Sequence, residues 1–278
     1  EILVTGSAKL DFYRFGGDSL QGRYHYLRLL PLTLAEVHGK KYGDLSSLLR
    51  YSGFPEPFSR QSDVETRRWS KQYRTRLVQE DLRNLEMVQD LGSFELLMGR
   101  LPACVGAPLS VNSLREDLQL AHKTVAKWLT ILERLYAVFR LSPVGGPRIR
   151  AVKKEQKCYL FDWASIAEES ARFENLVAVH LLKYIYWMED SEGRDVELRY
   201  FRDTDGREVD FVVLENGFPS FFVECKLSDR DIHPALRYLC AKNPRVPAYQ
   251  ISLNGKQDYQ SVEGIRVCPA HVFLRDLI

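Results

Sequence analysis

The sequence predicts an α/β protein of several domains, and three observations support this. First, 278 residues are too many for one typical domain, so two or three are expected. Second, residues 110–162 read as two helices followed by two strands. Third, from Trp163 onward a long helix precedes three strands, a second helix and further strands, which is typical of a mixed sheet. The predicted domains are residues 1–42, 43–105, 106–162 and 163–278.

The composition is that of a soluble globular protein, with 45% hydrophobic and 27% charged residues. A formal charge of +2 does not indicate a nucleic-acid binder, so any basic surface must be local. Neither a signal peptide nor an apolar run of about 20 residues is found, and no membrane partner is expected. The five cysteines form no C-x-x-C pair, which argues against a zinc site and favours a reducing cytoplasm.

Within the first predicted domain, residues 1–37 read as strand, loop and strand, and the last of these residues enter a helix. "ILVTGS" is a short apolar strand, and "FGGDSLQGR" is a glycine-rich loop. The apolar stretch "YHYLRLLPLTLAEV" enters a helix with Thr33 as its cap and Glu36 at its third position, the pattern of a capping box. Because the chain begins directly with a strand and lacks an initiator Met, we expect the N-terminal part of a longer protein to be missing.

Residues 43–105 combine a turn with a charged helical region. "YSGFPEPF" has glycine and proline at positions that disfavour regular structure, and residues 62–99 follow a helical pattern. This region is either a solvated helix face or a surface that contacts phosphates. Its basic patch consists of Arg67, Arg68, Lys71, Arg74 and Arg76, with Trp69 and Tyr73 interleaved.

Residues 106–162 predict a winged helix-turn-helix. "VNSLREDL" is a short helix with Asn112 or Ser113 as its cap, and "AHKTVAKWLTILERLY" is a longer, poorly capped helix. Two strands around a glycine- and lysine-rich loop follow. Such a module either binds DNA or acts as a spacer between protein domains. The outward-facing residues of the second helix are expected to be His122, Lys123 and Lys127.

Three charged residues interrupt the apolar stretch "VDFVVLENGFPSFFVECK", namely Asp210, Glu224 and Lys226. Clustered carboxylates hold Mg²⁺ or Mn²⁺ in enzymes that hydrolyse phosphodiesters. A neighbouring lysine can orient the water or stabilise charge at the phosphate. Glu224 and Lys226 are two residues apart on a strand and therefore share a face. These three residues are the candidate catalytic residues.

The register of the hairpin decides whether its two carboxylates meet. Asp210 stands opposite Glu224 only if the loop has an odd number of residues. A two-residue turn would instead pair Asp210 with Val223 and send Glu224 to the other face. We therefore expect an odd loop at about 215–219, with both carboxylates on one face.

A third carboxylate, Glu174, lies on the apolar stripe of the helix that precedes the sheet. A carboxylate on a face directed at a sheet requires a cation or another partner. Glu174 therefore either completes a metal site with Asp210 and Glu224 or is an ordinary glutamate at the edge of the surface.

The succession of these motifs resembles prokaryotic AAA+ ATPases with a C-terminal domain of unknown function. The resemblance covers almost the whole chain, through "ILVTGSAKLDF", "SGFPEPF", "SVNSLREDLQLAHKTVAKWLTILERLY" and "GREVDFVV…FFVECK". It implies that the first stretch is the sensor-1 strand, with Ser7 (or Thr5) facing the ATP γ-phosphate. It also implies that Arg23 acts on phosphate, in its own subunit or in a neighbouring one. The alternative role of Arg23 is a structural ion pair.

The C-terminal domain is similar to the PD-(D/E)XK restriction-endonuclease-like fold. The resemblance implies that Asp210 and Glu224 are metal ligands and that Lys226 is the catalytic lysine. Glu174 would be the helical carboxylate, and the carbonyl of Cys225 could also reach the metal. The complete chain would then comprise the end of an AAA+ core, a helical region with a winged helix, and a nuclease-like domain.

The sequence departs from the family at its N-terminal end. The phosphate-binding loop G-x-x-x-x-G-K-[ST] and the Walker-B strand are absent, so ATP is expected only in a full-length protein. Two hypotheses follow for the function: a Mg²⁺- or Mn²⁺-dependent DNA nuclease controlled by ATP, or a non-catalytic, nucleotide-regulated module that binds DNA or protein. A third is a packing unit with a solvated charged face. Self-association through the AAA+ region is a further expectation.

Overall fold

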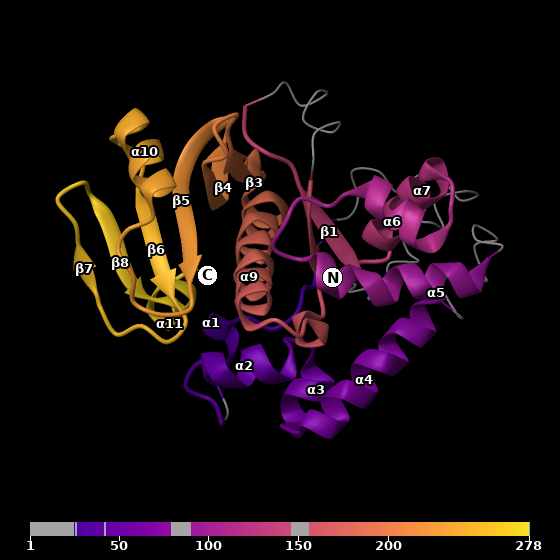
Figure 1. The fold of residues 1–278 in the computed structure, drawn as a ribbon. Coiled ribbons are helices and arrows are strands. Elements are labelled where there is room, and N and C mark those ends of the chain that lie inside the picture. The colour runs from indigo at the N-terminus through magenta and orange to yellow at the C-terminus, as the bar shows by residue number, and fades with distance from the viewer. Residues whose placement is uncertain (1–24, 26, 42, 79–89, 146–155, 278) are drawn as a thin grey trace.

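The computed structural model describes residues 25, 27–41, 43–78, 90–145 and 156–277. Ser7 and Arg23, the predicted nucleotide-contacting residues, lie outside these ranges. Within them, Figure 1 shows one long helix, α9 (Glu169–Glu192), between a β-sheet and a group of shorter helices. The structure is therefore mixed α/β, as the sequence predicts.

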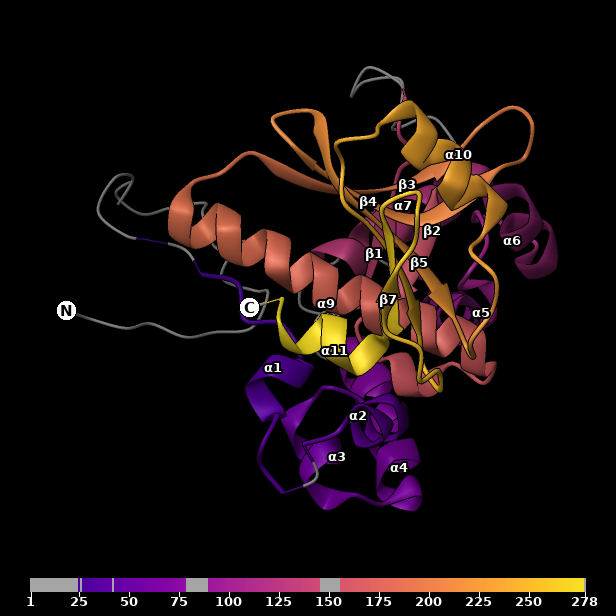
Figure 2. The ribbon, with the colours of Figure 1, turned by 90° about the vertical axis from the view of Figure 1, so that its left-hand side faces the viewer.

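The first helices form the group below α9 in Figure 2. Phe54 to Phe58, predicted as a turn, instead enter a helix, because a proline at the first helical position is compatible with helical geometry. The helix α4 is capped by Ser62, whose side chain accepts a hydrogen bond from the Glu65 N–H. The bounds are α1 (Leu34–Val37), α2 (Leu45–Tyr51), α3 (Pro55–Arg60), α4 (Asp63–Arg76), α5 (Leu91–Arg100) and a 3₁₀ turn (Leu101–Cys104).

Two helices and a hairpin follow in the predicted order, while their assignment as a winged helix stays a prediction. The cap of the first helix is Ser110, whose Oγ accepts the Ser113 N–H at 3.1 Å, so the prediction of Asn112 or Ser113 as cap was wrong. The second helix has no side-chain cap, as expected. Its exposed residues include His122, Lys123 and Lys127. The bounds are α6 (Val111–Leu118), α7 (His122–Arg134), β1 (Val138–Leu141) and β2 (Lys157–Leu160).

The C-terminal part is a mixed six-stranded sheet in the order β3-β4-β5-β6-β8-β7. Its first three strands form an antiparallel meander, and β6 lies parallel to both β5 and β8. The helices α9 and α10 lie on opposite sides of this sheet (Figure 1). The bounds are β3 (Val196–Arg202), β4 (Glu208–Glu215), β5 (Phe218–Lys226), α10 (Pro234–Lys242), β6 (Ala248–Ser252), β7 (Tyr259–Gln260), β8 (Ile265–Pro269) and α11 (Ala270–Arg275).

One large hydrophobic cluster joins the helical half to the sheet through α9, and a second lies beneath α10. Burial of apolar surface is the main favourable term in folding, so the two halves stabilise each other. Members of the large cluster from successive elements are Leu34, Leu48, Phe94, Leu129, Phe173, Leu181, Phe211 and Val223.

The segment before α1 is attached to the C-terminal end of α9. The Arg28 guanidinium pairs with Glu189 and Asp190, each at 2.6 Å, and lies 3.4 Å from the centre of the Tyr186 ring. Nearer the middle of α9, the Lys183 ammonium pairs with Glu36 at 2.6 Å. The predicted capping box of α1 is confirmed, and Glu36 also accepts the backbone N–H of Thr33 at 2.7 Å.

His180 joins α9 to α1 inside the core. Its Nε2 accepts the Leu34 N–H at 2.9 Å, and its Nδ1 lies 2.8 Å from the Leu176 carbonyl oxygen. These partners require the neutral ring with the proton on Nδ1. Burial lowers the pKa of His180 to about 4, and the Lys183 ammonium lowers it further, whereas Leu176 and Glu36 oppose the change.

We therefore expect acid to destabilise the protein through His180. The unfolded chain binds the proton near the usual pKa of about 6.5 and the folded chain only near 4. Stability from this residue is present above about pH 6.5 and is lost as the pH falls towards 4, by roughly 3 kcal/mol in total. Urea unfolding at several pH values measures it. His180→Gln keeps an acceptor for Leu34 but does not titrate, so a wild-type slope equal to that of this variant would contradict the assignment.

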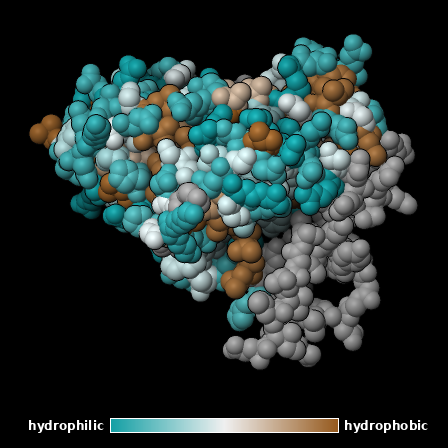
Figure 3. Space-filling model, turned by 90° about the horizontal axis from the view of Figure 1, so that it is seen from below, coloured by the Kyte–Doolittle hydropathy of each residue, from teal (hydrophilic) through white to brown (hydrophobic). Residues whose placement is uncertain are grey.

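The described surface is mixed in character. Seen from below, it is mainly hydrophilic with smaller hydrophobic areas (Figure 3). Among the helices of the described ranges, none has both the length and the apolar composition needed to cross a membrane. All five cysteines are free thiols.

Candidate functional site

The loop of the β4–β5 hairpin differs from the predicted one. β4 ends at Glu215 and β5 begins at Phe218, so the turn is Asn216-Gly217. Both residues have positive φ values, 52° and 82°, as a tight two-residue hairpin turn requires. The predicted odd loop at 215–219 was therefore wrong.

A β-bulge compensates for the shorter turn. Leu214 pairs with Pro219 next to the turn. The next pair is Val213 with Phe221, which leaves Ser220 as an extra residue in β5. Side chains alternate between the two faces of a sheet along a strand. One extra residue therefore moves every later side chain of β5 to the opposite face.

Beyond the bulge the register is the one that the site needs. Phe211 pairs with Val223, and the same register continued by one residue places Asp210 opposite Glu224. The predicted meeting of the two carboxylates therefore arises from the bulge instead of from the loop.

Asp210, Glu224 and Lys226 lie close together. The Asp210 N–H donates to Glu224 Oε2 at 3.3 Å, and the Cys225 N–H donates to Asp210 Oδ2 at 2.9 Å. The Lys226 ammonium donates to Glu224 Oε1 at 2.6 Å. Glu224 is only 3% exposed. Its burial, and then the nearby charge of Asp210, raise the pKa of Glu224 to about 8.

Two residues that the sequence analysis did not select surround Glu224. Gln250 lies beside it on β6, and its side chain accepts the His233 N–H at 2.8 Å and donates to the Arg230 carbonyl at 3.0 Å. His233 Nδ1 lies 3.5 Å from Glu224 Oε1 and has no hydrogen-bond partner among the described residues. A buried glutamine in the apolar strand "AYQIS" was the signal that could have found this region.

We call the side chains of Glu174, Glu208, Asp210 and Glu224 the carboxylate cluster. Lys157, the first residue of β2, lies among them, and the sequence did not predict it there. Its Nζ lies 2.6 Å from Glu208 Oε1, 3.1 Å from Glu174 Oε1 and 3.7 Å from Asp210 Oδ1. The side chain is 1% exposed. Burial alone would lower the pKa of this ammonium, but the carboxylates of Glu174, Asp210 and Glu208 raise it above its usual value. Lys157 is therefore charged and buried.

Glu174, on α9, is another partner of Lys157, and its side chain is only 13% exposed, so it is not a surface-edge residue. The Tyr159 hydroxyl donates to Glu174 Oε1 at 2.7 Å. Gly106 lies near the other oxygen of Glu174, since a Cβ atom built on this glycine would be 3.7 Å from it. Burial, and then the charge of Asp210, raise the pKa of Glu174 to about 7.

The donors in this cluster have the chemistry that Mg²⁺ and Mn²⁺ prefer, because all are carboxylate oxygens. Burial is the main cause of the raised pKa values of Glu174 and Glu224, and the negative charge of Asp210 adds to it, whereas Lys157 and Lys226 oppose the change. The described residues nevertheless include no group of three or more His, Cys, Asp or Glu that could hold a metal ion as they stand. The Lys157 ammonium contacts both Glu174 and Asp210.

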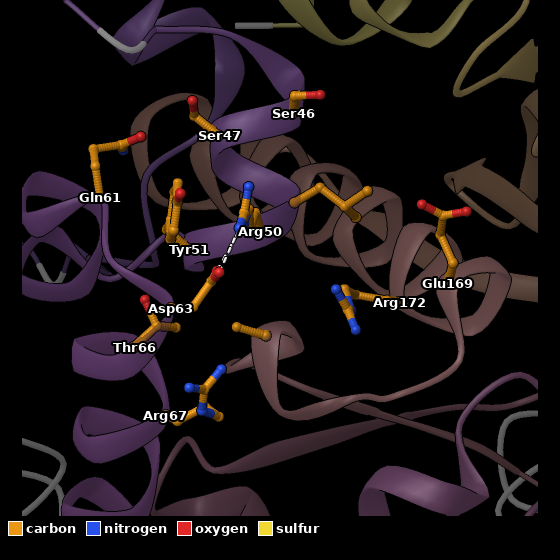
Figure 4. Close-up of a pocket in the computed structure, with 12 residues that line it drawn as sticks. Ser46, Ser47, Arg50, Tyr51, Gln61, Asp63, Thr66, Arg67, Glu169 and Arg172 are labelled. Atoms are coloured by element: carbon orange, nitrogen blue, oxygen red, sulfur yellow. Dashed lines mark hydrogen bonds and ion pairs between the residues drawn. The ribbon is translucent and has the colours of Figure 1, made fainter.

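A separate cavity of about 560 Å³ lies between α2, α4 and the start of α9 (Figure 4). Arg50 on its wall pairs with Asp63, and Arg172 donates to the Ile166 carbonyl at 2.7 Å. Arg67, from the predicted basic patch, also lines it. The cavity contains none of the predicted site residues, so it is distinct from the carboxylate cluster.

The basic patch of α4 is partly engaged in packing. Trp69 stacks on Tyr73 with ring centres 5.1 Å apart, and its Nε1 donates to Glu56. Arg68 pairs with Glu65 at 3.0 Å. Contact with phosphates stays a prediction for this helix.

Two parts of the chain match protein families of unknown function, and these matches indicate no activity. Residues 42–168 match the family model described as Domain of unknown function (DUF8612), and residues 169–273 match that described as Domain of unknown function (DUF4143). Uncharacterised proteins of Mycobacterium bovis and Mycobacterium tuberculosis are each 23% identical over an alignment of 240 residues, and the matches cover 79% of this chain and 53% of the relative. The chain thus spans about half the length of the curated relatives it matches. No solved structure matches it.

Proposed function

We propose that the C-terminal domain is a metal-dependent nuclease in which Asp210 and Glu224 hold Mg²⁺ or Mn²⁺, Glu174 completes the ligand set, and Lys226 is the catalytic lysine. The observation that carries this proposal is the apposition of Asp210 and Glu224 on neighbouring strands, with the Lys226 ammonium 2.6 Å from Glu224. The resemblance to PD-(D/E)XK domains gives the same roles to the same residues.

Each side chain has a separate task in this proposal. A bound divalent ion would lower the pKa of a water molecule and polarise the phosphate. Glu224 and Asp210 would hold that ion, and the backbone N–H groups of Asp210 and Cys225 fix the orientation of the two carboxylates. Burial alone would lower the pKa of Lys226, but Glu224 raises it, so the side chain stays a cation that can contact a phosphate oxygen.

DNA is the proposed substrate because exposed basic side chains, His122, Lys123 and Lys127, follow one another on α7. For the whole protein we propose ATP binding, with Ser7 and Arg23 at the nucleotide, self-association through the AAA+ region, and a cytoplasmic location. These statements rest on the resemblance.

A second candidate function is a non-catalytic module that binds DNA or protein through the same fold. It is favoured by Lys157, because an ammonium group beside Glu174 and Asp210 neutralises the carboxylates that a metal ion would use.

Cleavage assays separate the two functions. With Mn²⁺ and labelled single-stranded, duplex and branched DNA, we expect wild-type cleavage to fall by about 100-fold or more in Asp210→Ala and in Lys226→Ala. The matched controls Asp205→Ala and Lys256→Ala change exposed residues outside the cluster and should cleave as wild type does.

Folding of each variant is checked by circular dichroism and thermal unfolding. Cleavage that persists in both Asp210→Ala and Lys226→Ala, or none by the wild type on any substrate, would reject the nuclease and leave the binding module.

A further inference from the structure

We propose that the Lys157 ammonium competes with a divalent metal ion for the carboxylates of Glu174 and Asp210. The β1–β2 hairpin, which carries Lys157, would thereby weaken metal binding at this site. This inference rests on the proposed function, since it concerns regulation of the same site. It assigns the β1–β2 hairpin, in the part of the chain before the proposed nuclease domain, a direct effect on that domain's chemistry.

The position of the Lys157 ammonium supports competition. It reaches three carboxylates, of Glu174, Glu208 and Asp210, within 3.7 Å. Two of these, Glu174 and Asp210, belong to the proposed ligand set. An ion that bound the same oxygens would stand beside a buried ammonium, and two like charges at such distances repel strongly away from water.

The burial of Lys157 shows that this contact is not an incidental surface pair. A buried lysine is rare unless it is paired, because the loss of hydration must be offset by its partners. The side chain crosses from β2 to carboxylates on α9 and β4. The cluster thereby obtains from the hairpin the positive charge that a metal ion would otherwise supply.

The hairpin is fastened on both sides, so Lys157 does not leave the cluster without breaking other contacts. On one side, the buried Asn175 side chain accepts the Leu160 N–H at 2.8 Å and donates to the Leu160 carbonyl at 2.6 Å. On the other side, the Val144 N–H, just beyond β1, donates to the Tyr200 carbonyl on β3 at 2.8 Å. The packing of the hairpin against α9 and β3 thus keeps the backbone of Lys157 beside the carboxylates.

Titration calorimetry with MnCl₂ tests the competition. We expect Lys157→Met, which keeps the unbranched chain up to the position of Cε and removes the charged group, to bind Mn²⁺ at least about tenfold more tightly than the wild type. Asp210→Ala in the Lys157→Met background should abolish that binding. Lys256→Met, at an exposed lysine outside the cluster, is the matched control, and its affinity for Mn²⁺ should equal that of the wild type.

Lys157→Gln is the second variant, for use if the Lys157→Met protein does not fold. Its side chain has no charge but keeps a hydrogen-bond donor. The Mn²⁺-dependent rise in melting temperature is the second readout, since a ligand that binds the folded state raises its stability. We expect a larger rise in Lys157→Gln than in the wild type.

The outcomes distinguish this inference from the proposed function. Mn²⁺ binding that depends on Asp210 in the wild type but is no tighter in either Lys157 variant overturns the inference alone. No Mn²⁺ binding in any protein overturns both. Tighter binding in the variants, without cleavage of DNA, supports the inference and rejects the nuclease.

Discussion

Replacing Trp163 by alanine is expected to lower the free energy of unfolding by about 4 kcal/mol, in the range for large aromatic residues removed from cores. The side chain is fully buried, and its Nε1 donates to the Leu48 carbonyl of α2 at 2.8 Å. It also packs against Gly53 so closely that a Cβ there would lie 2.4 Å from the ring. The variant therefore loses apolar packing and leaves a buried carbonyl without its donor.

Urea denaturation of Trp163→Ala measures this effect, with Trp187→Ala as the matched control. Trp187 is 45% exposed, so its loss should cost less than about 1 kcal/mol. Equal effects of the two substitutions would show that the packing of Trp163 against α2 and His180 does not stabilise the fold.

The second large effect is expected at Asn175. Asn175→Leu keeps the branching and the number of heavy atoms of the side chain but removes the two hydrogen bonds to Leu160. Both backbone groups of Leu160 lose these partners, and at about 1–3 kcal/mol for each buried group the variant should be destabilised by roughly 3 kcal/mol. Thermal and urea unfolding measure it.

Asn112→Leu, on the exposed face of α6, is the control for Asn175→Leu and should change the stability by less than about 0.5 kcal/mol. The same Asn175→Leu protein should show faster hydrogen exchange at Leu160, because β2 loses one of its attachments to α9. Unchanged exchange would mean that other contacts hold the hairpin.

The local patterns predicted the elements well where periodicity was strong. The structure contains the predicted capping box of Thr33 and Glu36, and α7 begins without a side-chain cap, as predicted. The order helix, meander, helix after Trp163 is also present. The mixed sheet follows from that order, since a helical crossover after a meander allows parallel pairing.

The hairpin shows where sequence reasoning reached a correct result by a wrong route. Asn216-Gly217 is a strong turn signal, and the structure uses it. The condition that two carboxylates share a face was met by the bulge at Ser220, which no local pattern indicated. A bulge depends on how two strands pair, so the sequence of one strand alone does not predict it.

Lys157 was missed for a different reason. It begins the apolar run "KCYLF" after a glycine- and lysine-rich loop, and a lysine in that place reads as a solvated residue. Its partners lie on α9 and β4, so its burial depends on how the hairpin packs against the sheet. The roles of Ser7 and Arg23 stay predictions from the resemblance.

The most direct test of metal binding at the carboxylates, and of its competition with Lys157, is anomalous diffraction from crystals of Lys157→Met soaked in MnCl₂, compared with wild-type crystals treated alike. We expect a manganese peak bound by Asp210 with Glu174 or Glu224 in the variant, and a weaker peak at the same place in the wild type. A variant without manganese at these carboxylates, or equal peaks in both proteins, would contradict this expectation.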